Sequence, residues 1–180
     1  MDSTTYAYLA GFFDGEGSIS IERAGMNSQS LRINAVNTDP RPIEMLQRVF
    51  AGNFRSTLFR GRTKDGREYR PTYHWRVSST LAKDALEAML PYLTVKRERA
   101  EIAIAFERLR QQHHSLYEYQ RHPDEAWQAR EDLRGLMLTL NNRVCGVPHR
   151  PRPVPVGKIN RSLRAGRMGN IIQIQKQEVG

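Results

Sequence analysis

The sequence has few of the features that mark membrane or secreted proteins. Its single cysteine, Cys145, excludes an intramolecular disulfide and, on its own, a cysteine-built zinc site. No stretch approaches the roughly 18 uninterrupted apolar residues that a membrane span needs. Residues 1–17 contain no lysine or arginine, so the basic start of a signal peptide is missing as well. These absences predict an intracellular protein that is not secreted and has no membrane partner.

Positive charge, in contrast, is in excess and unevenly distributed. The 180 residues carry a net charge of +9. Residues 1–17 hold three acids and no base, whereas residues 18–80 hold eleven bases against five acids. Residues 81–149 are balanced, and residues 150–180 hold seven bases against one acid. Two basic segments indicate a polyanionic partner such as nucleic acid, with a surface charged only for solubility as the alternative.

Helical spacing of apolar residues predicts five helices. The first begins near Ser3 and continues to Phe13, and Gly15 and Gly17 are expected to end it with positive φ angles. The other helices are expected at 40–51, 79–90, 95–112 and 124–141. The 95–112 helix is expected to face inward with Ile102, Ala105, Phe106 and Leu109.

Alternation of polar and apolar residues predicts four strands, at 18–22, 31–36, 54–60 and 69–79. In the last strand Tyr73, Trp75 and Val77 share one face, and polar residues share the other. The order of elements indicates an α+β fold. We expect a folded body over 1–146, a proline-rich linker over 147–156 and a basic tail over 157–180.

Three segments resemble one protein family. Residues 9–19 read LAGFFDGEGSI and resemble the signature of the LAGLIDADG homing endonucleases. The segments at 36–39 (VNTD) and 90–97 (LPYLTVKR) look like the same family, and the order of elements is also the same over about 5–142. The resemblance implies an αββαββα core with a four-stranded antiparallel DNA-binding saddle and additional C-terminal helices.

The function implied by this resemblance is sequence-specific cleavage of double-stranded DNA. The protein would hydrolyse phosphodiesters with a metal ion, as a homodimer on a long pseudo-palindromic site, in a bacterial or phage cytoplasm or in an organelle. One alternative is a maturase or regulator of the same fold that binds DNA or RNA without cleaving it. Another is an unrelated basic α+β protein that binds DNA without sequence preference.

The resemblance also implies roles for individual residues. It places metal binding on the Glu16 carboxylate and the Gly15 carbonyl, and a basic active-site role on Lys96. A supporting polar position falls at 37–39, where Asp39 could equally cap the following helix. Glu16 stands where the family has aspartate, which lengthens the ligand by one methylene. Hard oxygen ligands and a phosphate substrate favour Mg²⁺, with Mn²⁺ as a substitute and Ca²⁺ as one that does not support cleavage.

The first helix also has the spacing of a close helix contact. Ala7, Gly11 and Gly15 recur every four residues, which leaves one side of the helix without bulk. Because the chain holds one motif, a second helix would come from another copy. We expect Ala10 and Asp14 to belong to this dimer interface too, with Asp14 supporting the local structure.

The resemblance to this family implies that the polar faces of the strands enter the major groove of DNA. Arginine suits guanine and asparagine suits adenine, so this face can read bases. The expected DNA-binding residues are Ser18, Ser20, Glu22, Arg32, Asn34, Arg55, Arg60, Thr72, His74 and Arg76. The basic tail is expected to contact phosphates outside the core site, or else to remain solvated.

Overall fold

The structure is a computed structural model that describes residues 2–23, 28–59, 61–62, 65–114 and 124–143. These residues all belong to the first of the two units into which the chain divides, Met1–Gly146. Arg60, the 147–156 linker and the 157–180 tail lie outside the described residues, so the predictions made for them stay predictions. The elements are α1 (Ser3–Glu16), β1 (Gly17–Arg23), β2 (Gln29–Asn37), α2 (Pro40–Phe50), β3 (Asn53–Thr57), β4 (Thr72–Ser78), α3 (Ser79–Met89), the short 3-10 helix η1 (Leu90–Tyr92), α4 (Arg97–His114) and α5 (Asp124–Arg143).

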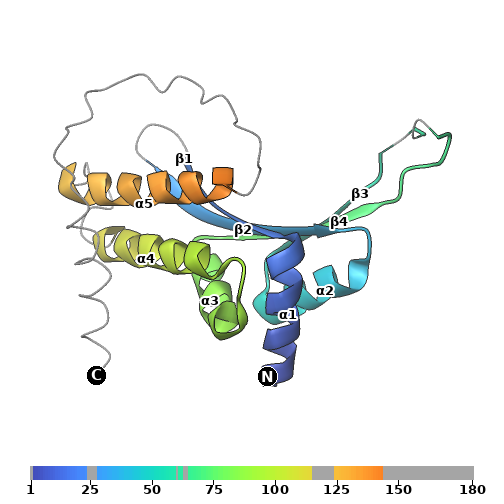
Figure 1. Ribbon diagram of the computed structural model, residues 1–180, viewed down its shortest axis with the longest axis horizontal. Helices are drawn as coiled ribbons and strands as arrows, with labels where there is room; N and C mark the ends of the chain where they lie inside the picture. The colour runs from blue at the N-terminus through green and yellow to red at the C-terminus, as the bar shows by residue number, and fades with distance from the viewer. Residues whose placement is uncertain (1, 24–27, 60, 63–64, 115–123, 144–180) are drawn as a thin grey trace. The chain divides into compact units, whose positions relative to one another are not determined.

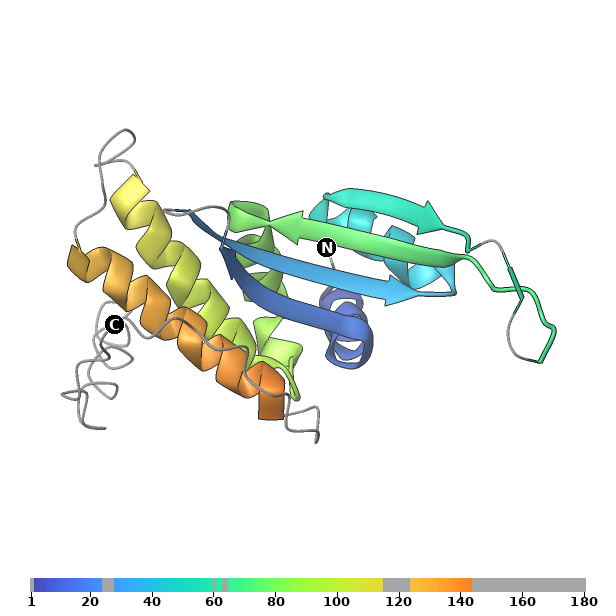
Figure 2. The ribbon, with the colours of Figure 1, turned by 90° about the horizontal axis from the view of Figure 1, so that it is seen from above.

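The four strands form one antiparallel sheet in the order β1-β2-β4-β3 (Figure 2). Ile19 of β1 lies opposite Ile33 of β2, and Ala35 of β2 lies opposite Trp75 of β4. Directly opposite residues of an antiparallel pair project from the same face, so the apolar side chains gather on one side. The predicted α+β fold with an antiparallel four-stranded sheet is confirmed. Strands β3 and β4 are shorter than predicted, because β3 ends at Thr57 and β4 begins at Thr72.

Helices α1 to α4 pack against the apolar face of the sheet, and the core lies between the two layers (Figure 1). Trp75 lies in this core, where its indole Nε1 donates a hydrogen bond of 2.7 Å to the carbonyl of Ala51. Its ring meets Phe13 of α1 edge-on, with the centroids 6.5 Å apart. The C-terminal end of α1 is therefore fixed against the sheet, and its N-terminal end points away from it (Figure 1).

The junction of α1 and β1 differs from the sequence prediction. Gly15 lies inside the helix, and Gly17 has a φ of −81°, so neither residue has the predicted positive φ. The chain passes directly from helix to extended strand. A Cβ atom on Gly17 would lie only 2.3 Å from the Phe13 ring. Glycine at this position is thus explained by the packing of Phe13, and the junction holds Glu16 where helix and sheet meet.

The predicted inner face of α4 is partly wrong. Phe106 is buried as predicted, but Ala105 and Leu109 are only half-buried, whereas Ala100 and Ala103 are fully buried. The physical reason is that α4 packs against both α3 and α5, so its buried side is broader than one stripe. Small alanine side chains on that side let the helices approach closely.

Helix α5 is held against the β1–β2 hairpin by side-chain hydrogen bonds. The Glu131 carboxylate accepts hydrogen bonds from Arg23 of β1 and from Gln29 of β2. The Asn141 amide donates a bond of 3.1 Å to the carbonyl of Ile19. Within the described ranges, neither this helix nor any other is long and apolar enough to cross a membrane.

Candidate active site and nucleic-acid interface

The carboxylate of Asp14 joins the last turn of α1 to the segment that precedes α4. It accepts hydrogen bonds from the backbone amides of Thr94, Val95 and Lys96, at 2.7, 3.1 and 2.9 Å. We refer to these three bonds as the Asp14 clamp. The expectation that Asp14 supports local structure is confirmed. Because its carboxylate is engaged within the chain, Asp14 is poorly suited to the role of a metal ligand.

Lys96 is held beside the same turn of α1. Its ammonium donates a hydrogen bond to the backbone carbonyl of Asp14, and the side chain is half-buried. Burial lowers the pKa of Lys96 from its usual value; Arg99 lowers it further, whereas the nearby Asp14 and Glu16 carboxylates oppose the shift. The structure thus places the ammonium close to both acids of the motif, which are about eighty positions away in the sequence.

Glu16 ends α1 with an exposed side chain, and it has no hydrogen-bond or ion-pair partner among the described residues. The neighbouring Gly15 carbonyl belongs to the last turn, where helix carbonyls lack an intrahelical partner. A free carboxylate beside a free carbonyl fits a hard cation such as Mg²⁺. No group of three or more acidic, histidine or cysteine side chains gathers in the described part of the chain. One chain therefore offers only part of a coordination sphere.

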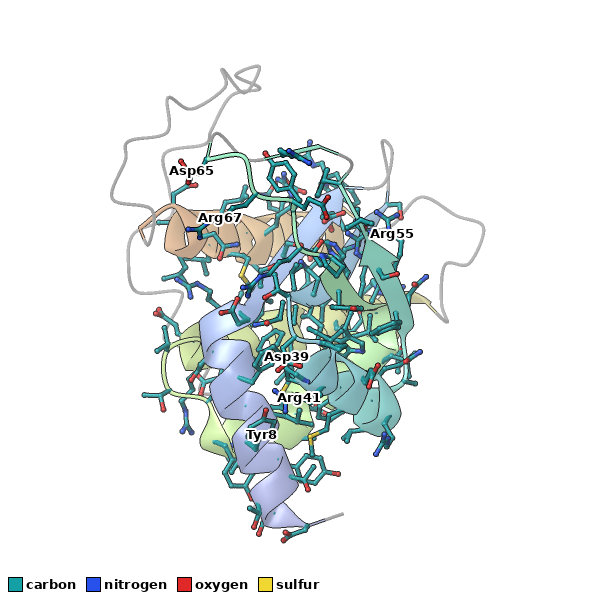
Figure 3. The ribbon with its side chains drawn as sticks, turned by 90° about the vertical axis from the view of Figure 1, so that its right-hand side faces the viewer. Tyr8, Asp39, Arg41, Arg55, Asp65 and Arg67 are labelled. Carbon is teal, nitrogen blue, oxygen red and sulfur yellow. The ribbon has the colours of Figure 1, made fainter. Side chains whose placement is uncertain are left out.

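Asp39 caps helix α2. Its carboxylate accepts a bond of 3.0 Å from the backbone amide of Arg41 and also pairs with the Arg41 guanidinium (Figure 3). That side-chain contact, followed by the backbone bond, lowers the pKa of Asp39 to about 2. No contact joins Asp39 to Glu16 or Lys96 among the residues that the structure describes. The geometry thus supports the capping alternative for Asp39, and its active-site role stays a prediction.

The small residues of α1 lie on a face that the rest of the described chain leaves open. Ala7, Gly11 and Gly15 are exposed, and a Cβ atom built on either glycine would meet nothing within 4 Å. Tyr8 lies beside them and is 53% exposed. Ala10, however, is completely buried in the core of its own chain. The prediction that Ala10 takes part in a dimer interface is therefore wrong, because its side chain faces the core of its own chain.

The strand register places the predicted DNA-binding residues of the described strands on one face of the sheet, opposite the core. Ser18 lies opposite Asn34, which in turn lies opposite Arg76. Arg55 of β3 lies opposite His74 of β4, so it shares this face despite the irregular alternation of its segment. The predicted residues found here are Ser18, Ser20, Glu22, Arg32, Asn34, Arg55, Thr72, His74 and Arg76. We call this surface the open face.

Hydrogen bonds order part of the open face. Ser18 donates to Asn34 Oδ1 at 2.7 Å, and the Thr72 hydroxyl lies 3.2 Å from His74 Nε2. Arg55 and Arg76 are exposed and have no side-chain partner within the described residues. The face therefore combines oriented polar groups with two free guanidinium groups.

Four polar residues of the open face were not among the predicted DNA-binding residues. Ser30 lies opposite Glu22, Asn53 opposite Arg76, Thr57 opposite Thr72, and Ser78 opposite Arg32. The alternation of β2 extends to Ser30, so this residue could have been found by continuing the pattern. The two residues of β3 could not, because the pattern there was irregular and the register comes from pairing with β4.

Comparison with known proteins agrees with this architecture. The family model described as a LAGLIDADG-like domain matches residues 3–90. No curated protein matches the chain in sequence.

Solved structures of homing endonucleases have the same fold. The homing endonuclease I-CvuI, crystallised with its target in the presence of Ca, superposes with a TM-score of 0.54 at 16% identity, covering 96% of this chain and 94% of that one. I-CvuI with another target and Mg, in which the DNA is not cleaved, gives 0.57 at 16% identity, with 95% and 94% covered. An archaeal intron-encoded homing endonuclease complexed with DNA gives 0.58 at 13% identity, and both chains are covered in full. The resemblance found in the sequence is thereby confirmed: residues 3–90 form a LAGLIDADG-like domain, and the chain has the fold of the single-domain LAGLIDADG homing endonucleases.

Proposed function

We propose that this protein is a site-specific endonuclease that hydrolyses both strands of duplex DNA as a Mg²⁺-dependent homodimer. The position of Glu16 carries the proposal. Its carboxylate is exposed and has no hydrogen-bond or ion-pair partner in the described chain, at the point where α1 meets the sheet. The Lys96 ammonium is held beside this turn, and the open face begins at the next strand.

The open face has the size and chemistry of a DNA-binding surface. The nine residues of β2 extend over about 30 Å at roughly 3.3 Å per residue, which is close to one turn of the double helix. The major groove admits a β-ribbon, and it presents acceptors that arginine can recognise. Arg55 and Arg76 have free guanidinium groups for such contacts, and one sheet would cover one half-site.

The exposed small residues of α1 support a homodimer. Gly11 and Gly15 have open space around them in the single chain, so their small size does not serve packing within it. A second α1 could approach closely along this side. The same contact would bring two Glu16 carboxylates and two Gly15 carbonyls together, which completes the oxygen ligands that one chain lacks.

The residues of this site suit phosphodiester hydrolysis. Mg²⁺ bound by Glu16 and the Gly15 carbonyl would supply Lewis-acid stabilisation of the phosphate and lower the pKa of water. The Lys96 ammonium is fixed by the Asp14 carbonyl, so it does not have to reorganise as negative charge develops on the phosphate oxygens. The Asp14 clamp keeps the backbone that carries Lys96 against α1.

Cleavage of a duplex library with randomised sequence, followed by sequencing of the products, tests the proposal. Wild-type protein with Mg²⁺ should cut at one long pseudo-palindromic site, Mn²⁺ should substitute, and Ca²⁺ should permit binding without cleavage. Glu16→Gln is the matched control, because it removes a ligand charge and changes no side chain of the open face. It should bind the same site and leave it intact. Specific binding by the wild type without cleavage in Mg²⁺ or Mn²⁺ would instead identify a non-cleaving maturase or regulator of this fold.

A further inference from the structure

Glu22 is unusual among the residues of the open face. It is the only acidic residue on that face in the described strands. A carboxylate near DNA phosphates is repelled, so it lowers affinity unless it has a specific role. Its neighbours on the face indicate what that role is.

Glu22 and Arg32 lie diagonally across the β1–β2 pair, since Arg32 is opposite Ser20 and Glu22 is opposite Ser30. The Arg32 guanidinium donates from its NH1 nitrogen to Glu22 Oε2. The Ser20 hydroxyl donates to the other oxygen, Glu22 Oε1, at 3.3 Å. Both carboxylate oxygens are therefore held, and the acid has a fixed direction.

The pair remains open to a ligand. The side chains of Arg32 and Glu22 are 33% and 41% exposed. The Arg32 Nε nitrogen is buried, so Arg32 can donate to a ligand only from its terminal nitrogens. The pair thus presents donors next to an acceptor, with no net charge.

We propose that Arg32 and Glu22 act together to read one G·C base pair in each half-site. Arg32 donates to O6 and N7 of guanine, and Glu22 accepts from the N4 amino group of the paired cytosine. In the major groove, guanine offers two acceptors and its cytosine offers one donor beside them, which matches the order of groups in this pair. An A·T pair would place the thymine O4 acceptor against the carboxylate, which is repulsive. This inference rests on the proposed function, because it assigns the open face to the major groove.

The register also gives the position of this base pair. Ser18, Asn34 and Arg76 form one row across the sheet, and Ser20, Arg32 and Ser78 form the next. Rows two residues apart are separated by about 6.6 Å along the strand, or about two base pairs at roughly 3.4 Å each. Since β1 leads away from Glu16, the base pair read by Arg32 should lie about two positions farther from the cut than the one read by Arg76.

Affinity selection from randomised duplexes in Ca²⁺ tests the inference. The wild type should select a G·C pair at this position. Arg32→Ala should reduce the selectivity for this pair at least tenfold. Glu22→Gln should weaken the preference at the same base pair and allow A·T there, because glutamine can also donate and accept at adenine. Arg32→Lys keeps the charge but loses the planar fork, so it should restore overall affinity without restoring the preference. Arg76→Ala should relax a base pair about two positions closer to the centre.

Arg108→Ala is the matched control, because Arg108 of α4 likewise pairs with a glutamate, Glu87 of α3, but lies outside the open face. It should leave the selected sequence unchanged. If Arg32→Ala weakens all sequences alike, the residue contacts phosphate and the inference is wrong. If Glu22→Gln leaves the preference intact, Glu22 does not read a base. If the wild type selects no sequence at all, both the proposed function and the inference are wrong. If the wild type selects a site and neither Arg32→Ala nor Glu22→Gln changes it, the inference alone is wrong.

Discussion

Asp14→Ala should unfold more easily than the wild type, although Asp14 belongs to the motif that marks the nuclease family. The substitution removes all three bonds of the Asp14 clamp, which join α1 to residues 94–96. The chain connecting these two segments runs through the whole sheet, so nothing nearby in sequence replaces the contact. We therefore expect a loss of global stability.

The size of the loss follows from the number and setting of these bonds. A hydrogen bond to a charged acceptor contributes about 1.5–3 kcal/mol, so three give an upper limit of about 4.5–9 kcal/mol. Thr94 and Val95 are exposed, and water can satisfy their amides once the carboxylate is gone. Removing an anion from the end of a helix also regains about 0.3–1 kcal/mol. Together these effects predict a loss of about 2–4 kcal/mol.

Urea unfolding followed by tryptophan fluorescence measures this difference, because Trp75 lies in the core. With a slope of about 2 kcal/mol per molar, the midpoint should fall by about 1–2 M. Glu16→Ala is the matched control at the same helix end. Its side chain is exposed and unpartnered in the described chain, so its midpoint should stay the same or rise slightly. Equal midpoints for the two variants would show that the Asp14 clamp adds no net stability.

Four further results are expected. Lys96→Met should slow cleavage far more than it weakens DNA binding, since its charge acts mainly on the transition state; equal losses would reduce Lys96 to a simple phosphate contact. Gly11→Leu should give a monomer in sedimentation, because a branched side chain overfills a close helix contact, and an intact dimer would place the interface elsewhere. Because the pKa of Asp39 is lowered to about 2, its contribution to the free energy of unfolding is present above about pH 4 and lost toward pH 2. Asp39→Ala should therefore reduce the urea midpoint at neutral pH and leave it unchanged near pH 2. Deleting residues 157–180 should leave the cleavage pattern unchanged. It should reduce the magnitude of the slope of log K for DNA binding against log salt concentration by about 0.9 per lost phosphate contact.

The faces of the sheet could be predicted from the sequence, because the alternation of polar and apolar residues lies within each strand. Alternation alone put Trp75 and Val77 on the buried face and His74 and Arg76 on the other. The capping alternative for Asp39 was also readable, since it needs only the residues that follow. Alternation is irregular around Arg55, and the pairing of β3 with β4 is what fixes the predicted residue on this face.

The contacts that define the site are long-range, and the sequence carried no direct sign of them. Asp14 meets residues 94–96 across about eighty positions, and spacing within either segment does not show that they touch. Ala10 shows the reverse error, because small size suits both a helix interface and a tight place in the core, and the structure buries this residue in the core. For Gly17 the sequence predicts a positive φ, whereas the reason for glycine there is the nearby Phe13 ring.

The spacing of the two acids in the motif explains how one helix end can hold the fold together and still present a carboxylate that has no hydrogen bond in the described chain. With 3.6 residues per turn, residues two apart project about 200° from one another, so Asp14 and Glu16 face opposite ways. Asp14 turns toward residues 94–96 and is held by three amides, which leaves Glu16 directed away with no partner in the described chain. Gly15 between them adds no side chain that would cover its own carbonyl. The same clamp that stabilises the fold also brings Lys96 to this turn, so loss of Asp14 should displace the cation along with the stability. A carboxylate at the helix end is unfavourable for folding by about 0.3–1 kcal/mol, and a bound cation at Glu16, as proposed above, would offset this cost.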